Sequence, residues 1–169
     1  MLPRAMGILF RAAQAADAAR LVSLAAELGY PTTNAELEVR LARLLAEPGH
    51  VVFVAEEAGE LLGWIHAQEF HSLASPPAGL VTGLVVTAAR RRGGLGRGLL
   101  EAVEGWARAR SLDVLRLRVN KKRRGARAFY ERLGFQRTKE QLQYTKLLSS
   151  TVARRSRRAS ARGRASSRV

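Results

Sequence analysis

The chain has 169 residues, of which 47% are hydrophobic and 25% are charged, a composition typical of one globular domain and not of a disordered chain. It contains no cysteine, which excludes a disulfide scaffold, cysteine-ligated zinc, iron–sulfur sites and thiol nucleophiles, and no apolar run approaches the roughly 20 residues that span a bilayer. The formal net charge of +15, taken alone, indicates a polyanionic partner such as nucleic acid.

The spacing of apolar residues predicts an α/β domain over residues 1–147. In chain order we expect a strand at 7–11, helices at 18–28 and 37–47, strands at 51–55, 61–67 and 80–87, a helix at 95–110, a strand at 114–119, a helix at 126–133 and two strands within 135–147. Thr33-Asn34-Ala35-Glu36 has the form of a capping box before the second helix, and a polar loop with Ser75-Pro76-Pro77 precedes the fourth strand. The order predicts a mixed, mostly antiparallel sheet.

The positive charge is concentrated in two stretches. Residues 1–89 hold five arginines and nine acidic residues, a net charge of −4, whereas residues 90–127 carry +10 and residues 128–147 carry +2. Residues 148–169 hold seven arginines, no acidic residue and almost no large apolar residue, so we expect a disordered basic tail. We favour a solvated tail without a specific partner, and a nucleic-acid-binding arm is the alternative.

A basic, glycine-rich turn joins the fourth predicted strand to the third predicted helix. Its residues are Arg91, Arg92, Gly93, Gly94, Leu95, Gly96, Arg97 and Gly98. The glycines let the backbone approach a ligand closely, and the first amides of a helix form an anion site together with the helix dipole. The arginines add forked donors that suit phosphate oxygens. The turn therefore predicts a cradle for a pyrophosphate group.

Two common nucleotide motifs do not fit this turn. A Walker A loop ends in Gly-Lys-Ser/Thr, and the turn contains no lysine. A dinucleotide fingerprint needs a third glycine where this chain has Leu99, and an acidic residue at the end of the next strand, whereas Asp113 precedes that strand.

The sequence resembles the GNAT superfamily of acetyl-CoA-dependent N-acetyltransferases. Residues 91–96 read Arg-Arg-Gly-Gly-Leu-Gly, which matches the family motif [Q/R]-x-x-G-x-[G/A], and Leu84-Val85-Val86 precede it. A second family motif is matched by Val119-Asn120, by Ala126 and by residues 129–135, Phe-Tyr-Glu-Arg-Leu-Gly-Phe. The spacing between the motifs also fits, and the resemblance covers roughly residues 7–147.

The resemblance implies a sheet of about seven strands with about four helices, and transfer of acetyl from acetyl-CoA to a primary amine by direct attack in a ternary complex, without a metal. By similarity, the backbone of Leu84, Val85 and Val86 binds the pantetheine arm, and the amides from Arg92 to Gly98 hold the pyrophosphate. Tyr130 matches the general acid that protonates the CoA thiolate, a role that an ordinary phenol with a pKa near 10 can fill.

Two departures from the family pattern bear on the site. Many relatives have asparagine where this chain has Arg123, three residues before Ala126. Asn120 is therefore the candidate for that polar contact, and the resemblance implies that both Asn120 and Ala126 contact the cofactor. Many relatives also carry a carboxylate on the strand before the turn, and residues 80–86 have none. The candidates for the general base are His66, Glu69, His71 or a water molecule.

Several alternatives stay open from the sequence alone. The acceptor is a small-molecule or protein amine. The oligomeric state is open, with a homodimer as one alternative because dimers are common in the family, and we expect no membrane association. The first residues lack the apolar core of a secretory signal, so we expect a cytoplasmic protein. The alternatives to an enzyme are a CoA-binding regulatory module without turnover and a nucleic-acid-binding protein that acts through its tail.

Overall fold

The computed structural model describes residues 4–5, 7–121 and 124–148. The chain divides into two units, Met1–Leu133 and Gly134–Val169. Every helix and strand in the described part of the chain belongs to the first unit. The predicted basic tail, residues 148–169, lies outside the described residues except for Leu148.

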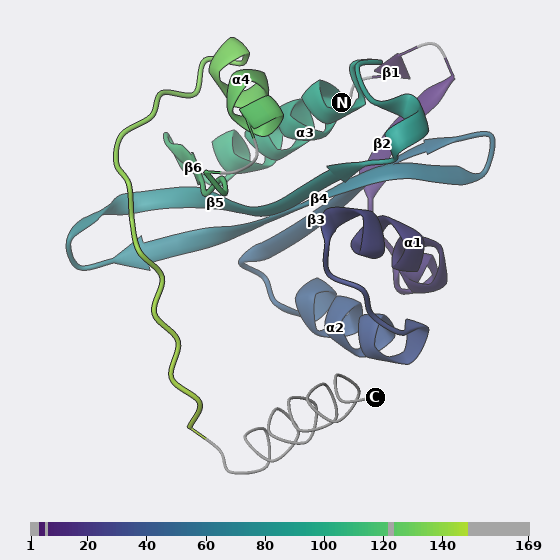
Figure 1. Cartoon of the computed structure of the whole chain (residues 1–169), viewed down its shortest axis with the longest axis horizontal. Coiled ribbons are helices and arrows are strands. Elements are labelled where there is room, and N and C mark those ends of the chain that lie inside the picture. Colours follow the sequence, from purple (N-terminus) through teal and green to yellow (C-terminus); the bar gives the residue numbers. More distant parts are fainter. Residues whose placement is uncertain (1–3, 6, 122–123, 149–169) are drawn as a thin grey trace, which may run out of the picture. The chain divides into compact units, whose positions relative to one another are not determined.

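A mixed sheet forms the centre of the first unit (Figure 1), and among the described residues it has six strands in the order β1-β2-β3-β4-β5-β6. The strands are β1 (Arg4–Ala5), β2 (Ile8–Ala12), β3 (His50–Glu57), β4 (Glu60–Ser72), β5 (Ser75–Val86) and β6 (Leu115–Leu117). Neighbours from β1 to β5 are antiparallel, and β6 is parallel to β5. The expected mixed, mostly antiparallel sheet is confirmed.

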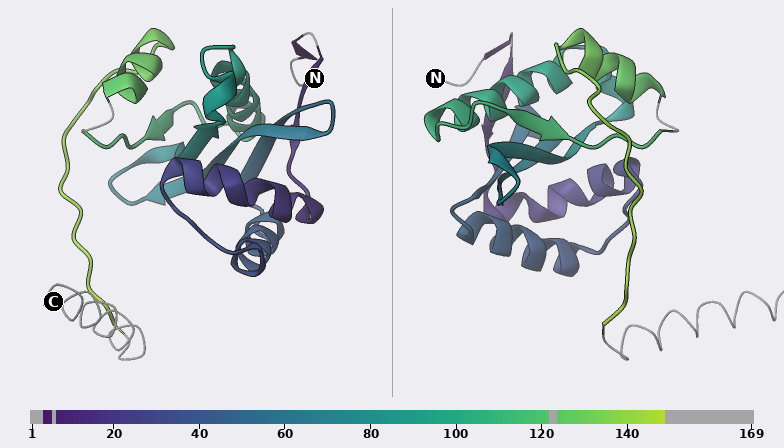
Figure 2. Two further views of the ribbon diagram at one scale, coloured as in Figure 1. Left: turned by 45° about the vertical axis from the view of Figure 1, so that its right-hand side comes forward. Right: turned by 90° about the vertical axis from the view of Figure 1, so that its left-hand side faces the viewer.

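Helices cover both faces of the sheet (Figure 2). They are α1 (Ala18–Leu28), α2 (Asn34–Ala46), α3 (Leu95–Ala109) and α4 (Arg124–Arg132), with short 3-10 turns η1 (Ala15–Asp17) and η2 (Ala88–Arg90). On the α1–α2 face, buried Leu21, Leu24 and Leu41 pack with Val54 and Val85. The opposite face carries α3 and α4, and the buried stripe of α3 includes Leu99, Leu100 and Val103.

The ends of the first two helices follow the expected local signals. Gly29 ends α1 with a φ of 97°, a left-handed conformation that glycine adopts without a Cβ clash. Thr33 caps α2: its hydroxyl accepts from the Glu36 amide, and the Glu36 carboxylate accepts from the Thr33 amide. The predicted capping box is therefore confirmed.

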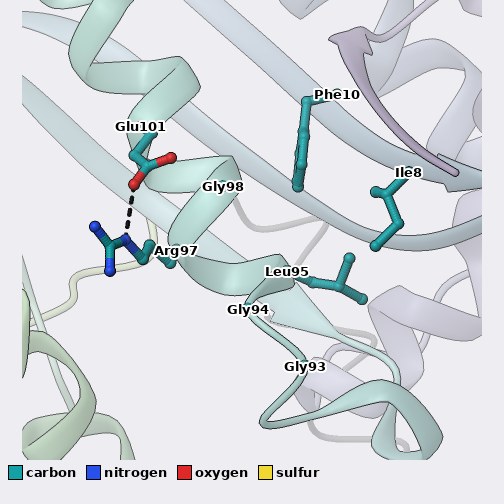
Figure 3. Close-up of a pocket in the computed structure, with 8 residues that line it drawn as sticks. All are labelled: Ile8, Phe10, Gly93, Gly94, Leu95, Arg97, Gly98 and Glu101. Atoms are coloured by element: carbon teal, nitrogen blue, oxygen red, sulfur yellow. Dashed lines mark hydrogen bonds and ion pairs between the residues drawn. The ribbon is translucent and has the colours of Figure 1, made fainter. Parts of the chain in front are cut away.

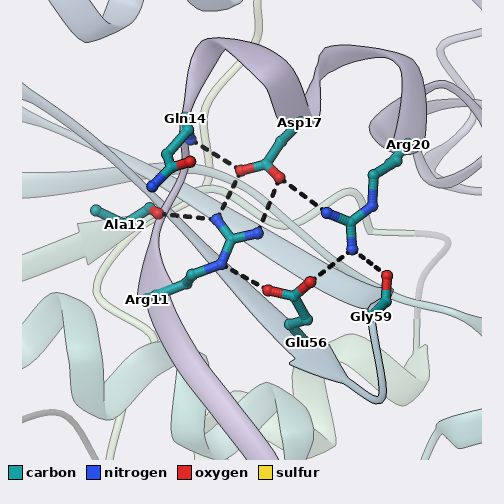
Figure 4. Close-up of polar contacts among 7 residues, drawn as sticks. All are labelled: Arg11, Ala12, Gln14, Asp17, Arg20, Glu56 and Gly59. Carbon is teal, nitrogen blue, oxygen red and sulfur yellow. Dashed lines mark hydrogen bonds and ion pairs between the residues drawn. The ribbon is translucent and has the colours of Figure 1, made fainter.

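A partly buried ion-pair network ties β2, β3 and α1 together (Figure 4). Asp17, whose side chain is 4% exposed, accepts two hydrogen bonds from Arg11, at 2.7 and 2.9 Å, and a third from Arg20. Arg11 and Arg20 also bind Glu56 on β3, each at 2.7 Å. The hydrogen bonds from Arg11 lower the pKa of Asp17 below its ordinary value of 3.8.

The loop predicted around Ser75-Pro76-Pro77 is wrong, because β4 and β5 form a long hairpin that turns between Ser72 and Ser75. The prolines remove no ladder bond to β6, whose pairing begins at Gly79. On the other side they lie opposite a register irregularity between Phe70 and Ser72. Proline is tolerated at such positions because its missing N–H has no partner to lose.

The two strands predicted within residues 135–147 are also wrong, since residues 135–148 are described and contain no strand. The apolar side chains whose alternating spacing predicted these strands are exposed, Leu142 to 82% and Tyr144 to 87%. A strand exists only where a neighbour takes its N–H and C=O groups, and alternation in a polar segment does not supply one. The short β1 was not expected from the sequence.

Candidate functional site

The sheet opens along one edge of β5. The parallel pairing with β6 consists of Gly79 with Leu115, Leu80 with Arg116 and Val81 with Leu117. Beyond Val81, Gly83 to Val86 pair with β4, and the whole stretch from Thr82 to Val86 has no strand of the described chain on its other side. Such an edge presents backbone donors and acceptors to a ligand.

The three residues predicted to bind pantetheine, Leu84, Val85 and Val86, all lie in this open stretch. The side chain of Val85 is 5% exposed and belongs to the core under α1 and α2. At Val85, therefore, only the backbone is available to a ligand.

A β-bulge lies at the start of the open stretch. His66 of β4 pairs with Gly83, and the next residue, Ala67, pairs with Val81, so that Thr82 is an extra residue on β5. Bulges bend a strand and redirect a side chain. The bulge coincides with the point at which the β6 pairing ends.

The glycine-rich turn leads from the open strand into α3. Gly94 is the N-cap of α3 with a φ of 81°, and Arg92 also has a left-handed φ, 67°. The first helical amides belong to Leu95, Gly96 and Arg97, and such amides have no intrahelical acceptor. The amide of Gly98 instead donates to the Gly94 carbonyl at 3.0 Å. This amide, which the sequence assigned to phosphate, is thus already used by the helix.

Gly96 and Gly98 also allow two aromatic rings to pack closely against α3. A Cβ on Gly98 would lie 2.7 Å from the Cε atoms of the Phe10 ring, and a Cβ on Gly96 would lie 3.0 Å from Cζ of Phe129. The start of α3 is therefore held between β2 and α4. A cavity of about 130 Å³ lies on the β2 side (Figure 3) and is lined by Ile8, Phe10, Gly93, Gly94, Leu95, Arg97, Gly98 and Glu101.

The arginines of the turn are matched by carboxylates from the acidic first part of the chain. Arg91 donates from Nε to the Val86 carbonyl at 3.1 Å, and its guanidinium lies 3.3 Å from Glu27. Glu27 also accepts from the Thr87 hydroxyl and the Ala88 amide, so α1 anchors the turn.

Two further arginines near the turn, Arg90 and Arg97, are also paired with carboxylates. Arg90 binds Glu57 through both guanidinium nitrogens, which lowers the pKa of that carboxyl. Arg97 pairs with Glu101 at 2.8 Å on the surface of α3. Arg92 has no ion pair with any residue in the described ranges, so its guanidinium is the one at the turn that is open to an anion.

The structure brings the two family motifs together through α4. The Phe129 ring touches Gly96, and the Tyr130 ring lies edge-on to Phe129 with centroids 5.1 Å apart. Tyr130 and Ala126, one helical turn earlier, are both half-buried. Asn120 is exposed in the segment after β6. Tyr130 is therefore beside the helix end that the glycine-rich turn creates.

Of the three candidate bases, His66 alone lies at the bulge. Its Nδ1 is 2.6 Å from the Thr82 hydroxyl and its Nε2 is 3.0 Å from Nδ1 of His50. Burial, and then the charge of His50, lower the pKa of His66 to about 4. Glu69 is bound to His71 at 3.1 Å and to Arg110 at 2.6 Å, farther along β4 toward the hairpin turn.

Sequence reasoning missed His50 and Thr82. Each is 16 residues from His66, and no spacing rule connects them. What brings His50 and Thr82 to His66 is the register of β3, β4 and β5, which is known only once the strands are paired. Within the described ranges no three His, Cys, Asp or Glu side chains gather into a metal site, and no helix there has the length and apolarity to cross a bilayer.

Comparison with solved structures finds the same fold at low sequence identity. The aminoglycoside N-acetyltransferase AAC(6')-Iy in complex with CoA is 18% identical with a TM-score of 0.76, over 86% of this chain and 99% of that chain. The aminoglycoside 6'-N-acetyltransferase AAC(6')-IG from Acinetobacter haemolyticus is 21% identical with a TM-score of 0.73, over 83% and 99%. A transcriptional regulator from Bacillus halodurans is 20% identical with a TM-score of 0.70, over 82% and 99%.

No curated protein sequence matches the chain significantly. The model of the acetyltransferase (GNAT) family matches residues 17–135, which include both motifs and the open edge of β5. Because this match spans well over half of the sequence, the chain belongs to the GNAT acetyltransferase family.

Proposed function

We propose that the chain is an N-acetyltransferase that moves acetyl from acetyl-CoA to a primary amine by direct attack in a ternary complex. The observation that carries this proposal is the open edge of β5 from Thr82 to Val86, which leads directly into the glycine-rich start of α3. An extended arm can bond to the edge as an added strand would, and a pyrophosphate can bind the helix amides.

Each part of the proposed site has its own role in binding acetyl-CoA or in the transfer. The backbone of Leu84–Val86 orients the pantetheine arm, while the amides of Leu95, Gly96 and Arg97 and the guanidinium of Arg92 hold the pyrophosphate. The amine nitrogen attacks the thioester carbonyl, and the C–S bond breaks as Tyr130 gives its phenol proton to the sulfur. The chain has no cysteine that could carry the acetyl group, which supports direct transfer. Much of the rate enhancement comes from holding amine and thioester together.

The acceptor class is an amine with further polar groups. Several proteins of the same fold are named aminoglycoside N-acetyltransferases, which supports aminoglycosides as the first compounds to test. Residues 1–89, which include α1 and α2, carry a net charge of −4, and this sign suits a cationic acceptor.

The proposal is tested in two steps on the full chain. Acetyl-CoA should raise the melting temperature progressively with concentration, because a ligand that binds only the folded state stabilises it by mass action. Free thiol should then appear only when an amine from a panel of aminoglycosides, polyamines and peptides is added. A thermal shift without thiol release would favour a CoA-binding module, and no shift at millimolar acetyl-CoA would contradict the proposed site.

A further inference from the structure

We infer that Thr82, His66 and His50 form a proton relay that removes the proton from the attacking amine. The inference rests on the proposed function and assigns the base that the strand before the turn lacks. The three residues come from β5, β4 and β3, so the relay crosses three neighbouring strands of the sheet.

The bulge places the relay's first member at the open edge. Thr82 is the extra residue of β5, it is exposed, and it directly follows the last residue paired with β6. It lies two positions before Leu84, the first of the residues proposed to bind the pantetheine arm. The hydroxyl of Thr82 is therefore the side-chain group of the relay that an amine at the thioester can reach.

The hydrogen bonds continue without a gap from this hydroxyl to His50. Oγ1 of Thr82 lies 2.6 Å from Nδ1 of His66, and Nε2 of His66 lies 3.0 Å from Nδ1 of His50. The two rings are stacked, with centroids 5.2 Å apart and an interplanar angle of 21°. Both imidazoles are half-buried, and both nitrogens of His66 are occupied by partners within the relay.

The environment keeps His66 neutral. Its pKa of about 4, lowered chiefly by burial, means that the ring is uncharged near neutral pH. A neutral imidazole has one nitrogen that accepts and one that donates, which a residue in the middle of a relay requires. His66 therefore passes a proton on and does not store it.

The proton transfer balances as follows. As the amine nitrogen forms its bond to the carbonyl carbon, one N–H proton moves to Oγ1 of Thr82, whose own proton moves to Nδ1 of His66. The Nε2 proton of His66 moves to Nδ1 of His50, which becomes an imidazolium and releases a proton to solvent. The electron pair of the broken C–S bond stays on sulfur, which takes the proton of Tyr130, and the phenolate then regains a proton from solvent. The products are an amide and CoA with a free thiol.

Glu69 and His71 do not fit this role. The Glu69 carboxylate is bound to Arg110 and His71, which lowers its pKa and makes it a weaker base. The His71 side chain is 64% exposed beyond Glu69 on the same strand. His71 is therefore a matched control, because the chain has three histidines and the relay uses the other two.

The kinetic test uses four variants, Thr82→Val, Thr82→Ser, His66→Gln and His71→Gln, in the thiol-release assay. We expect Thr82→Val and His66→Gln to lower kcat about 100-fold with an unchanged KM for acetyl-CoA. Thr82→Ser, which keeps a hydroxyl, should recover most of the activity that Thr82→Val loses, and the control His71→Gln should stay near wild type. The remaining rate of the two impaired variants should rise with pH as the free amine loses its proton in solution. A Thr82→Val enzyme with wild-type kcat and pH profile would overturn the relay.

A second measurement does not depend on turnover. Nitrogen-15 NMR of the histidines in the full chain should show His66 neutral down to about pH 5, with both nitrogens hydrogen-bonded, and Thr82→Val should change the Nδ1 signal. Histidine signals of His66 that are the same in Thr82→Val and in the wild type would overturn the relay. A wild-type chain that acetylates no amine would instead contradict the proposed function, and the relay with it.

Discussion

At the scale of single residues, one turn of α4 serves both packing and chemistry. Phe129 fills the space that Gly96 leaves open on α3, with a missing Cβ only 3.0 Å from its ring. The next residue, Tyr130, lies edge-on to that ring at 5.1 Å. Edge-to-face aromatic pairs favour a particular relative orientation, so the packing of Phe129 also positions the phenol of Tyr130.

The first prediction concerns this phenol. Tyr130→Phe keeps the ring and its contact with Phe129 but removes the proton proposed to reach the CoA sulfur. We expect kcat to fall about 100-fold, while the melting-temperature rise with acetyl-CoA stays the same. Tyr144→Phe, at a side chain that is 87% exposed, is the control and should change neither value. Wild-type turnover of Tyr130→Phe at saturating substrates would remove Tyr130 from the mechanism.

At the scale of elements, α3 contains glycines with opposite requirements. Gly98 lies under the Phe10 ring, where a Cβ would be 2.7 Å from the ring Cε atoms, whereas a Cβ on Gly105 would meet nothing within 4 Å. Both are interior positions of the same helix. Gly98 is thus required by packing against β2, while Gly105 only adds backbone freedom to the unfolded chain.

The second prediction compares these two positions. Gly98→Ala should destabilise the protein by about 1–3 kcal/mol because the added methyl overpacks the contact with Phe10. Gly105→Ala should stabilise it by up to about 1 kcal/mol because alanine is the better helix former. Urea unfolding measures both free energies, and equal effects of the two substitutions would show that Phe10 does not restrict position 98.

How much of the fold is predictable also differs between elements. The ends of α1 and α2 follow from Gly29 and the Thr33 capping box because those signals act within a few residues. The length of the β4–β5 hairpin and the absence of strands in residues 135–148 depend on which backbone groups find partners. The same holds for the site: the glycine-rich turn is a local pattern, whereas His50 and Thr82 join His66 only through strand register.

At the scale of the whole molecule, the net charge of +15 does not describe the surroundings of the site. Glu27 and Glu57, from the acidic first part of the chain, pair with Arg91 and Arg90 of the basic turn. These pairs neutralise much of the turn's charge and leave Arg92 without a carboxylate partner in the described ranges. This arrangement supports the proposed small anionic ligand more than a long polyanion.

The third prediction concerns acid stability. Breaking a buried ion pair leaves an uncompensated charge, so Asp17→Asn should cost about 3 kcal/mol of unfolding free energy near neutral pH. Since Arg11 lowers the folded-state pKa of Asp17 below 3.8, this stabilisation is complete above that pH and is lost as the pH falls through the folded-state value.

Urea unfolding over a pH series measures the gap between wild type and Asp17→Asn, which should narrow below pH 3.8. Glu104→Gln, which breaks a surface pair with Arg108 whose side chain is 73% exposed, should cost less than about 1 kcal/mol. A gap that stays constant down to about pH 2 would show that folding does not lower the pKa of Asp17.

The strand order β1-β2-β3-β4-β5-β6 also has a consequence for how the chain folds during synthesis. Every strand pairs with the strand that precedes it in the sequence, so each one leaves the ribosome after its template is already present. The β3–β4 and β4–β5 hairpins close over short turns, which keeps many contacts local and favours fast folding. The other edge of β5, by contrast, is paired last, because β6, which pairs with Gly79–Val81, follows only after α3 has been made.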